Sequence, residues 1–141
     1  MIHQYLGKIY LTPSGLESYK RRKKEFQKLR EATKDEHDEL LKINQKIEEI
    51  ELILKNYELI QAPPKDKQDA IDLGATVVLE IDGQTDEFTI VGTLEVNPSA
   101  GKISNESPVG KALLGRRVGD EITISSPIKI IYKIKAIRYD L

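Results

Sequence analysis

The chain of 141 residues contains no cysteine and no tryptophan, and only two histidines. Without cysteine it can form neither disulfide bonds nor thiolate metal sites, which suits a reducing compartment. No apolar run approaches the roughly 18 residues of a membrane-spanning helix, and the first residues do not resemble a cleavable signal. We therefore expect a soluble, cytoplasmic protein without membrane contacts.

Residues suited to catalysis are equally scarce. The two histidines, His3 and His37, lie far apart in the sequence, so a catalytic triad is hard to assemble. No glycine-rich loop follows a strand pattern, so nucleotide binding has no support. His37 could act as a ligand or base, but an exposed polar turn residue is the simpler interpretation.

The composition is typical of a folded, charge-rich protein, with 39% hydrophobic and 32% charged residues. This argues against disorder, and the length allows one domain or two small ones. The formal net charge is only −1, but the charges are unevenly distributed along the chain. Electrostatic arguments must therefore be local.

The first half, residues 12–60, has helical periodicity. Thr12 and Pro13 are typical of an N-cap followed by proline at the first helical position. A later apolar series is spaced alternately by three and four residues, which predicts a coiled-coil seam; it comprises Leu40, Ile43, Ile47, Ile50, Leu54 and Tyr57. An earlier, weaker series comprises Leu16, Tyr19, Phe26 and Leu29.

Two structures fit these two series. One is a single long helix, because Tyr19, Phe26 and Leu29 share the heptad phase of the later series and no glycine or proline intervenes. The other is an antiparallel hairpin that turns within the polar residues 30–39, with its tip near Thr33 to His37. A lone helix needs a partner chain to cover its seam, so periodicity slightly favours the hairpin.

The second half has the two-residue period of strands. Pro63 and Pro64 end the helical region, and Asp82-Gly83 is typical of a hairpin turn. The last strand, 128–139, should place one set of side chains on a single face: Ile128, Ile130, Tyr132, Ile134 and Ala136. We expect an α+β protein in which an N-terminal helical hairpin (1–62) and a linker (63–72) precede a small antiparallel sheet with one short helix (73–141).

Two charged clusters lie in the helical half. Five consecutive cations form either a solvated helix face or a patch that faces phosphates; they are Lys20, Arg21, Arg22, Lys23 and Lys24. Four carboxylates crowd the presumed tip, where they could solubilise the turn or share Mg²⁺ with another macromolecule; they are Asp35, Glu36, Asp38 and Glu39.

A short helix is expected between two strands in the second half. Ser107 is typical of its N-cap, Pro108 of its first residue, and Gly115 of its end. Stability does not explain the polar residues just before it, Asn105 and Glu106. A fixed loop beside a rigid helix start is how a docking epitope would be presented.

Three segments resemble the Gre family of bacterial transcript-cleavage and elongation factors, over most of the chain. They are "LTPSGLE", "IEEIELILKNYELI" and "FTIVG…GKISNESPVGKALLGRRVGDEI". The resemblance implies the hairpin rather than the single helix, and an FKBP-like C-terminal fold.

The resemblance also implies a function. The C-terminal domain would dock on bacterial RNA polymerase at the mouth of its secondary channel, through Asn105, Glu106, Ser107 and Pro108. The hairpin would enter the channel with the basic run 20–24 facing nascent RNA, and the tip acids would help hold Mg²⁺ in the polymerase active site. The polymerase would cleave backtracked RNA. The factor itself, expected as a monomer, would be no enzyme and would have no cofactor or metal site of its own.

The chain departs from the family at the tip. Cleavage-competent members carry a "GDLSENAEY"-like motif, whereas this chain has "KDEHDELLK". Each helical arm also looks shorter by roughly two turns, about 10 Å. A secondary-channel binder without cleavage activity, as in the short-hairpin Rnk type, is therefore the alternative. A prolyl isomerase is a remote third alternative. Such isomerases line their pocket with aromatic residues, and from Ala70 onward the only aromatics are Phe88, Tyr132 and Tyr139.

Overall fold

The structure, a computed structural model, describes residues 8–34, 36–125 and 128–141. The chain divides into two compact units, Met1–Leu59 and Ile60–Leu141. No helix in the described ranges is both long and apolar enough to cross a membrane.

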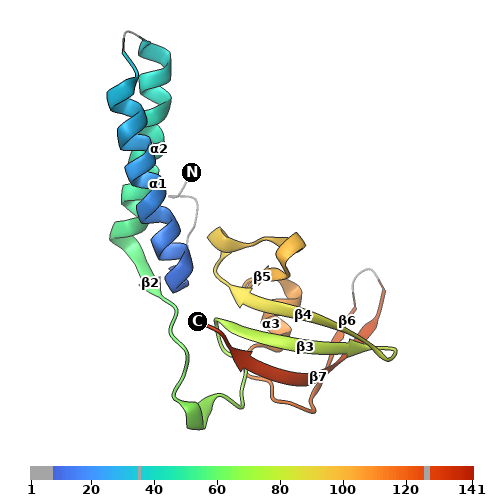
Figure 1. Ribbon diagram of the computed structural model, residues 1–141. Coiled ribbons are helices and arrows are strands. Elements are labelled where there is room, and N and C mark those ends of the chain that lie inside the picture. Colours follow the sequence, from blue (N-terminus) through green and yellow to red (C-terminus); the bar gives the residue numbers. More distant parts are fainter. Residues whose placement is uncertain (1–7, 35, 126–127) are drawn as a thin grey trace. The chain divides into compact units, whose positions relative to one another are not determined.

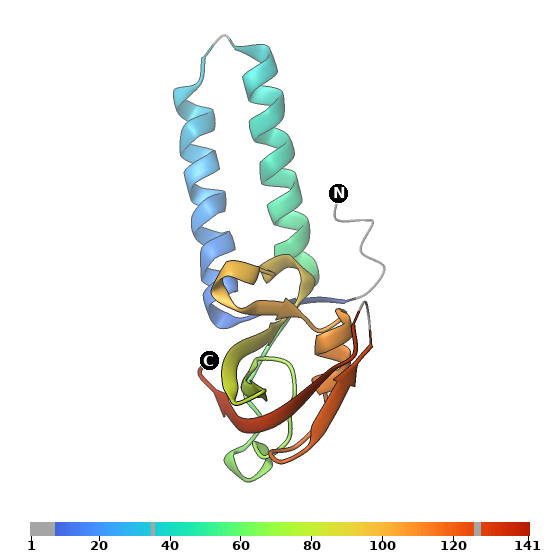
Figure 2. The same cartoon turned by 90° about the vertical axis from the view of Figure 1, so that its right-hand side faces the viewer.

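The first unit is a helical hairpin (Figures 1 and 2). Helix α1 (Pro13–Ala32) and helix α2 (His37–Asn56) each contain 20 residues and pack side by side. Of the two structures that the periodicity allowed, the hairpin is confirmed and the single long helix is wrong. The turn lies between Ala32 and His37, as predicted, and His37 is the first residue of α2.

The start of α1 follows the predicted capping pattern. Thr12 is extended, and its hydroxyl accepts a hydrogen bond from the Gly15 N–H at 3.1 Å. Pro13 occupies the first turn, where its missing N–H costs no helical hydrogen bond. Strand β1 (Ile9–Leu11) pairs in parallel with β2 (Tyr57–Leu59), which continues directly from α2. The chain must therefore reverse direction at Thr12 to enter α1.

The base of the hairpin carries an ion pair between these two strands. Lys8 Nζ lies 2.8 Å from Glu58 Oε1. The hydrogen bond to Glu58, together with its charge, raises the pKa of Lys8. The pair joins the residue just before β1 to the middle of β2, and both of its side chains are exposed.

The seam of α2 is close to the predicted one. Ile43, Ile47 and Ile50 are buried, but Ile53 is buried as well, while Leu54 is only half-buried. A straight helix has 3.6 residues per turn, so its buried stripe drifts from a strict heptad pattern. Leu29, predicted in the seam, is 48% exposed. Two contacts between the helices define how α1 and α2 are aligned: Lys23 lies opposite Glu51, and Arg30 lies opposite Asn44. This alignment places Leu29 at the level of the polar Gln45.

The second unit is a curled five-stranded sheet with one short helix, so the α+β prediction is confirmed (Figure 1). The strand order is β5-β4-β3-β7-β6. The bounds are β3 (Ala75–Ile81), β4 (Gln84–Val91), β5 (Lys102–Ser104), α3 (Pro108–Leu113), β6 (Glu121–Ile124) and β7 (Ile130–Tyr139), with single 3-10 turns η2 (Lys65–Lys67), η3 (Thr93–Glu95) and η4 (Pro98–Ala100). The predicted hairpin turn joins β3 to β4, and both of its residues have positive φ, 49° at Asp82 and 81° at Gly83.

The sequence predicts an antiparallel sheet, but one pair of strands in this sheet is parallel. Strand β5 pairs in parallel with β4, with Ile90 opposite Ile103. The chain leaves β4 through η3 and η4 and returns to the same edge before it enters β5. This return delivers residues 105–107 directly to the start of α3.

The core lies between one face of the sheet and α3. Alternate residues of β3 point into it and are fully buried, as the two-residue period predicts. Leu113 of α3 covers them and is also fully buried. The buried members of this cluster are Ile71, Ala75, Val77, Leu79, Ile90, Leu113, Ile122 and Ile134.

The predicted alternation of β7 fails at one point. The register shifts between Val78 and Leu79, which pair with Ala136 and Ile134, so Lys135 is an extra residue. Such a bulge reverses which side chains face the core. Ala136 is exposed in consequence, while Ile137 and Tyr139 turn toward the core. Ile128, predicted on the inner face, lies before the strand and is 71% exposed.

Part of the expected linker is integral to the second unit. Ile71 is 2% exposed, and its backbone exchanges hydrogen bonds with Gly115 and Arg116. Tyr139 fastens the same segment, because its hydroxyl donates to the Ala70 carbonyl and accepts from the Asp72 N–H. Burial raises the pKa of this phenol, against the opposite effect of the Asp72 hydrogen bond.

Candidate functional site

The loop before α3 is held by hydrogen bonds at each position. The Asn105 N–H donates to the Val91 carbonyl at 3.0 Å, and the Glu106 N–H donates to Ser104 Oγ at 3.0 Å. Ser107 caps α3: its hydroxyl accepts from the Gly110 N–H at 3.1 Å and donates to the Ser104 carbonyl at 2.7 Å. The loop is therefore tied to β4 and β5 as well as to its own helix.

Gly110 lets α3 sit close to β5. A Cβ atom at this position would lie 2.1 Å from the Ser104 carbonyl oxygen, which is far inside van der Waals contact. The same oxygen accepts hydrogen bonds from the N–H and the hydroxyl of Ser107. The missing side chain at residue 110 therefore allows the loop to close.

Thr93, in η3, holds the side chain of Glu106. Its hydroxyl donates to Glu106 Oε2 at 3.2 Å and lies 3.2 Å from Ser104 Oγ. The Glu106 side chain is exposed. Sequence reasoning missed Thr93 and Ser104, because the parallel pairing of β5 with β4 is what brings η3 beside the loop.

The loop thus presents four candidate docking residues in a fixed arrangement. Glu106 and Pro108 are exposed, whereas Asn105 and Ser107 are half-buried. Ser107 and Pro108 start the helix, as predicted. Their capping role and a docking role are compatible, since capping engages only the Ser107 hydroxyl and leaves Glu106 and Pro108 at the surface.

Four of the five consecutive cations of α1 line one open groove of about 520 Å³ on the hairpin. The lining residues are Glu17, Lys20, Arg21, Lys23, Lys24, Gln27 and Leu54. Lys20, Lys24 and Gln27 share one face of α1, because residues three and four apart are neighbours on a helix. Arg22 points elsewhere, with its guanidinium 5.0 Å from the centre of the Tyr19 ring.

Acidic neighbours partly neutralise the groove. Lys20 lies 3.8 Å from Glu17, Lys23 lies 3.8 Å from Glu51, and Arg21 lies 4.0 Å from Glu25. All three contacts are long. Those of Lys20 and Arg21 are exposed, and such pairs contribute little to stability, whereas Lys23 and Glu51 are half-buried. The cations can therefore exchange these partners for the phosphates of a nucleic acid.

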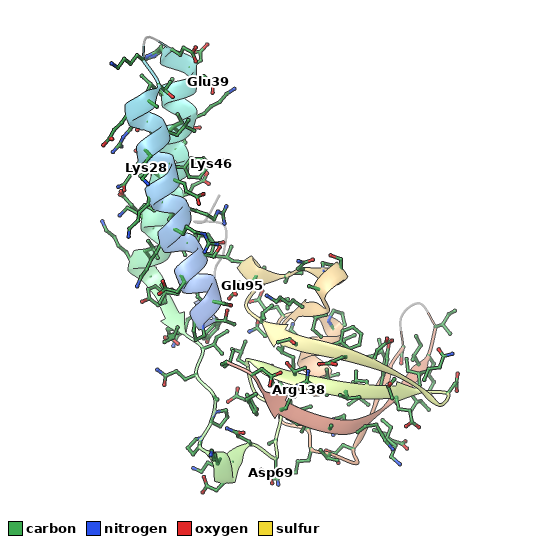
Figure 3. The ribbon with its side chains drawn as sticks, viewed as in Figure 1. Lys28, Glu39, Lys46, Asp69, Glu95 and Arg138 are labelled. Carbon is green, nitrogen blue, oxygen red and sulfur yellow. The ribbon has the colours of Figure 1, made fainter. Side chains whose placement is uncertain are left out.

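Three of the four acids predicted at the turn belong to the described residues. Asp35 lies outside the described residues, and within those that are described no three His, Asp or Glu side chains gather to hold a metal ion. Asp38 and Glu39 occupy the first turn of α2, near the end of the hairpin where Figure 3 shows Glu39. Negative charge is favourable at a helix N-terminus, so these two acids also stabilise α2. Glu36 is the N-cap residue but makes no side-chain capping bond.

The three aromatic residues considered for an isomerase pocket pack against the core. Phe88, Tyr132 and Tyr139 are all partly buried against the cluster beneath the sheet. The Tyr139 hydroxyl is engaged with Ala70 and Asp72. Core packing accounts for all three without a substrate pocket.

Comparison with known proteins gives a consistent result. Residues 65–139, more than half of the chain, match the family described as transcription elongation factor, GreA/GreB, C-terminal. The transcription elongation factor GreA of Thermomicrobium roseum is 50% identical over 91 residues, which are 64% of this chain and 58% of that protein. The GreA of Geobacillus kaustophilus is 40% identical over 104 residues, 72% of this chain and 65% of that protein.

The chain spans about three fifths of the length of these curated relatives. A solved structure of a GreA/GreB elongation factor from Nitrosomonas europaea is similar over 94% of this chain and 99% of its own. Its sequence identity is 23% and the TM-score is 0.50, which speaks for the fold.

Proposed function

Because the chain belongs to the GreA/GreB family of transcription elongation factors, we propose that it binds bacterial RNA polymerase at the secondary channel. In this proposal the second unit docks through the loop 105–108, and the hairpin acts on paused or backtracked complexes. The observation that carries the proposal is the family match over residues 65–139, which includes this hydrogen-bonded loop.

The basic groove of α1 would face nascent RNA. Lys20 and Lys24 line it on one side of the helix, and the contacts of Lys20, Arg21 and Lys23 with acids are long, at 3.8–4.0 Å. Each phosphate that such a cation neutralises adds salt-sensitive affinity. The polymerase would supply the catalytic site, and this chain would be no enzyme.

A second candidate function is binding in the channel without any effect on cleavage. The observation that favours it is the turn: no described carboxylates gather there to hold a metal, and Asp38 and Glu39 already have a role in stabilising α2. The same docking loop would serve both functions. The two candidates differ only in what the tip does after docking.

The experiment that separates them is a transcript-cleavage assay on a backtracked complex of the cognate polymerase. Neutralising the tip acids with Asp35→Asn, Glu36→Gln, Asp38→Asn and Glu39→Gln should leave docking intact and abolish the effect on the complex. The reason is that a tip acting through carboxylates needs their charge to hold a cation or to meet a basic channel wall.

Two controls accompany this variant. Glu48→Gln with Glu49→Gln removes acids from the middle of α2 and should change nothing. Helix content should be checked by circular dichroism, because losing Asp38 and Glu39 costs about 0.3–1 kcal/mol each at the helix N-terminus. A wild-type chain that binds the polymerase without stimulating cleavage would favour the second candidate, and a neutralised tip that keeps the full effect on cleavage would show that the tip acids are not needed.

The RNA contact is tested by crosslinking to the backtracked transcript at several salt concentrations. Lys20→Gln with Lys24→Gln should weaken the crosslink and reduce the salt slope by about 1.4, at roughly 0.7 per phosphate contact with a single strand. Lys42→Gln with Lys46→Gln is the matched control, since it removes the same charge from α2, at exposed residues that do not line the groove. Equal effects of the two variants would contradict a specific contact at the groove.

A further inference from the structure

Glu106 differs from the acids of the second unit that are held by ion pairs. Asp69, Glu80 and Glu87 each pair with a cation, namely Arg117, Lys135 and Arg138. Among the described residues, Glu106 has no ion-pair partner, and its carboxylate is held by the neutral hydroxyl of Thr93 instead. Its orientation is therefore restricted while its charge remains uncompensated.

Three contacts from two segments fix this arrangement. Thr93 lies in η3, which packs on β5 and brings its hydroxyl to both Ser104 Oγ and Glu106 Oε2. The Glu106 backbone N–H donates to the same Ser104 hydroxyl at 3.0 Å. Main chain and side chain of Glu106 each have a hydrogen-bond anchor, so binding costs less rotamer entropy than it would for an unanchored glutamate.

We infer that Thr93 is a positioning residue which presents the Glu106 carboxylate to a cationic side chain, arginine or lysine, on the docking surface of the partner protein. This inference rests on the proposed function and adds the chemistry of the contact. A carboxylate that binds a cation is a better acceptor when it is pre-oriented, because charge-assisted hydrogen bonds depend on geometry. A hydroxyl donor leaves the negative charge in place, whereas a resident lysine or arginine would cancel it.

The test is the affinity for the cognate core polymerase across a salt series, with four variants. Glu106→Gln keeps an acceptor for Thr93 and removes the charge, so it should weaken binding about tenfold and flatten the salt dependence. Thr93→Val keeps the shape and removes the hydroxyl, and a threefold to fivefold loss is expected, on the order of one lost interfacial hydrogen bond. Thr93→Ser should restore near wild-type affinity.

The double variant decides whether Thr93 acts through Glu106. Thr93→Val should add almost nothing in the Glu106→Gln background, since the charge it positions is already gone. An equal loss in both backgrounds would overturn the positioning role, and unchanged binding by Glu106→Gln would overturn the cation contact. A wild-type chain that does not bind the polymerase would instead overturn the proposed function, and this inference with it. Thermal unfolding of each variant confirms that the sheet remains folded.

Discussion

Replacing Gly110 with alanine should destabilise the second unit by about 3 kcal/mol, at the upper end of overpacking effects. The new Cβ would lie 2.1 Å from the Ser104 carbonyl oxygen. That oxygen is a backbone atom already fixed by Ser107, so it cannot move aside as the end of a flexible side chain would. Either α3 tilts away from β5, or the hydrogen bonds of the loop 105–107 break. Hydrogen exchange of the β3 amides measures the loss.

Gly115→Ala is the matched control for this variant. Its φ is +83°, but a Cβ at this position meets nothing within 4 Å. Backbone strain alone should then cost about 1–2 kcal/mol. Under the proposed function, Gly110→Ala should also weaken polymerase binding more than tenfold, because it displaces Glu106 and Pro108. A Gly110→Ala protein with wild-type exchange rates would show that the close approach is not needed.

Replacing Ile47 with aspartate should open the hairpin. Ile47 is 3% exposed in the middle of the seam, and burying an unpaired carboxylate there costs several kcal/mol. Isolated helices of this length are marginal in water. Helices α1 and α2 contribute 20 residues each and α3 only six, so most of the circular dichroism signal at 222 nm should disappear.

The control for this second variant is Gln45→Asp, which places the same side chain on the exposed face of α2. It should retain nearly all of the helical signal. The second unit has its own buried cluster around Leu79 and Leu113, so dispersed amide resonances from the sheet should survive in both variants. A helical Ile47→Asp protein would refute the account of the seam.

Local patterns in the sequence were sufficient where each residue acts through its neighbours. The cap at Thr12, the turn at Asp82-Gly83 and the start of α3 at Ser107 were all predicted. Each depends on backbone conformation or hydrogen bonds within a few residues. The alternation of buried residues in β3 was predictable for the same reason, because successive side chains of a regular strand point to opposite faces and the sequence shows this two-residue period.

Features that depend on pairing between distant segments were not predictable from those patterns. The bulge at Lys135 has no signal in β7 itself, because it arises from the register with β3. The parallel return of β5 to β4 likewise places Thr93 beside Glu106, although the two are 13 residues apart. The family resemblance pointed to the loop 105–108 but not to the residue that holds it.

The two helices of the hairpin carry opposite net charge, and this has a consequence for how the protein approaches its target. Helix α1 has seven basic and three acidic side chains, a net charge of +4, whereas α2 has three basic and five acidic ones, a net charge of −2. The hairpin is therefore an electric dipole perpendicular to its long axis. Near a polyanion such a dipole experiences a torque that turns α1 toward the polyanion. The torque acts when the two are within a Debye length of each other, about 8 Å at physiological salt. Rotation about the hairpin axis would thus be selected before any contact forms.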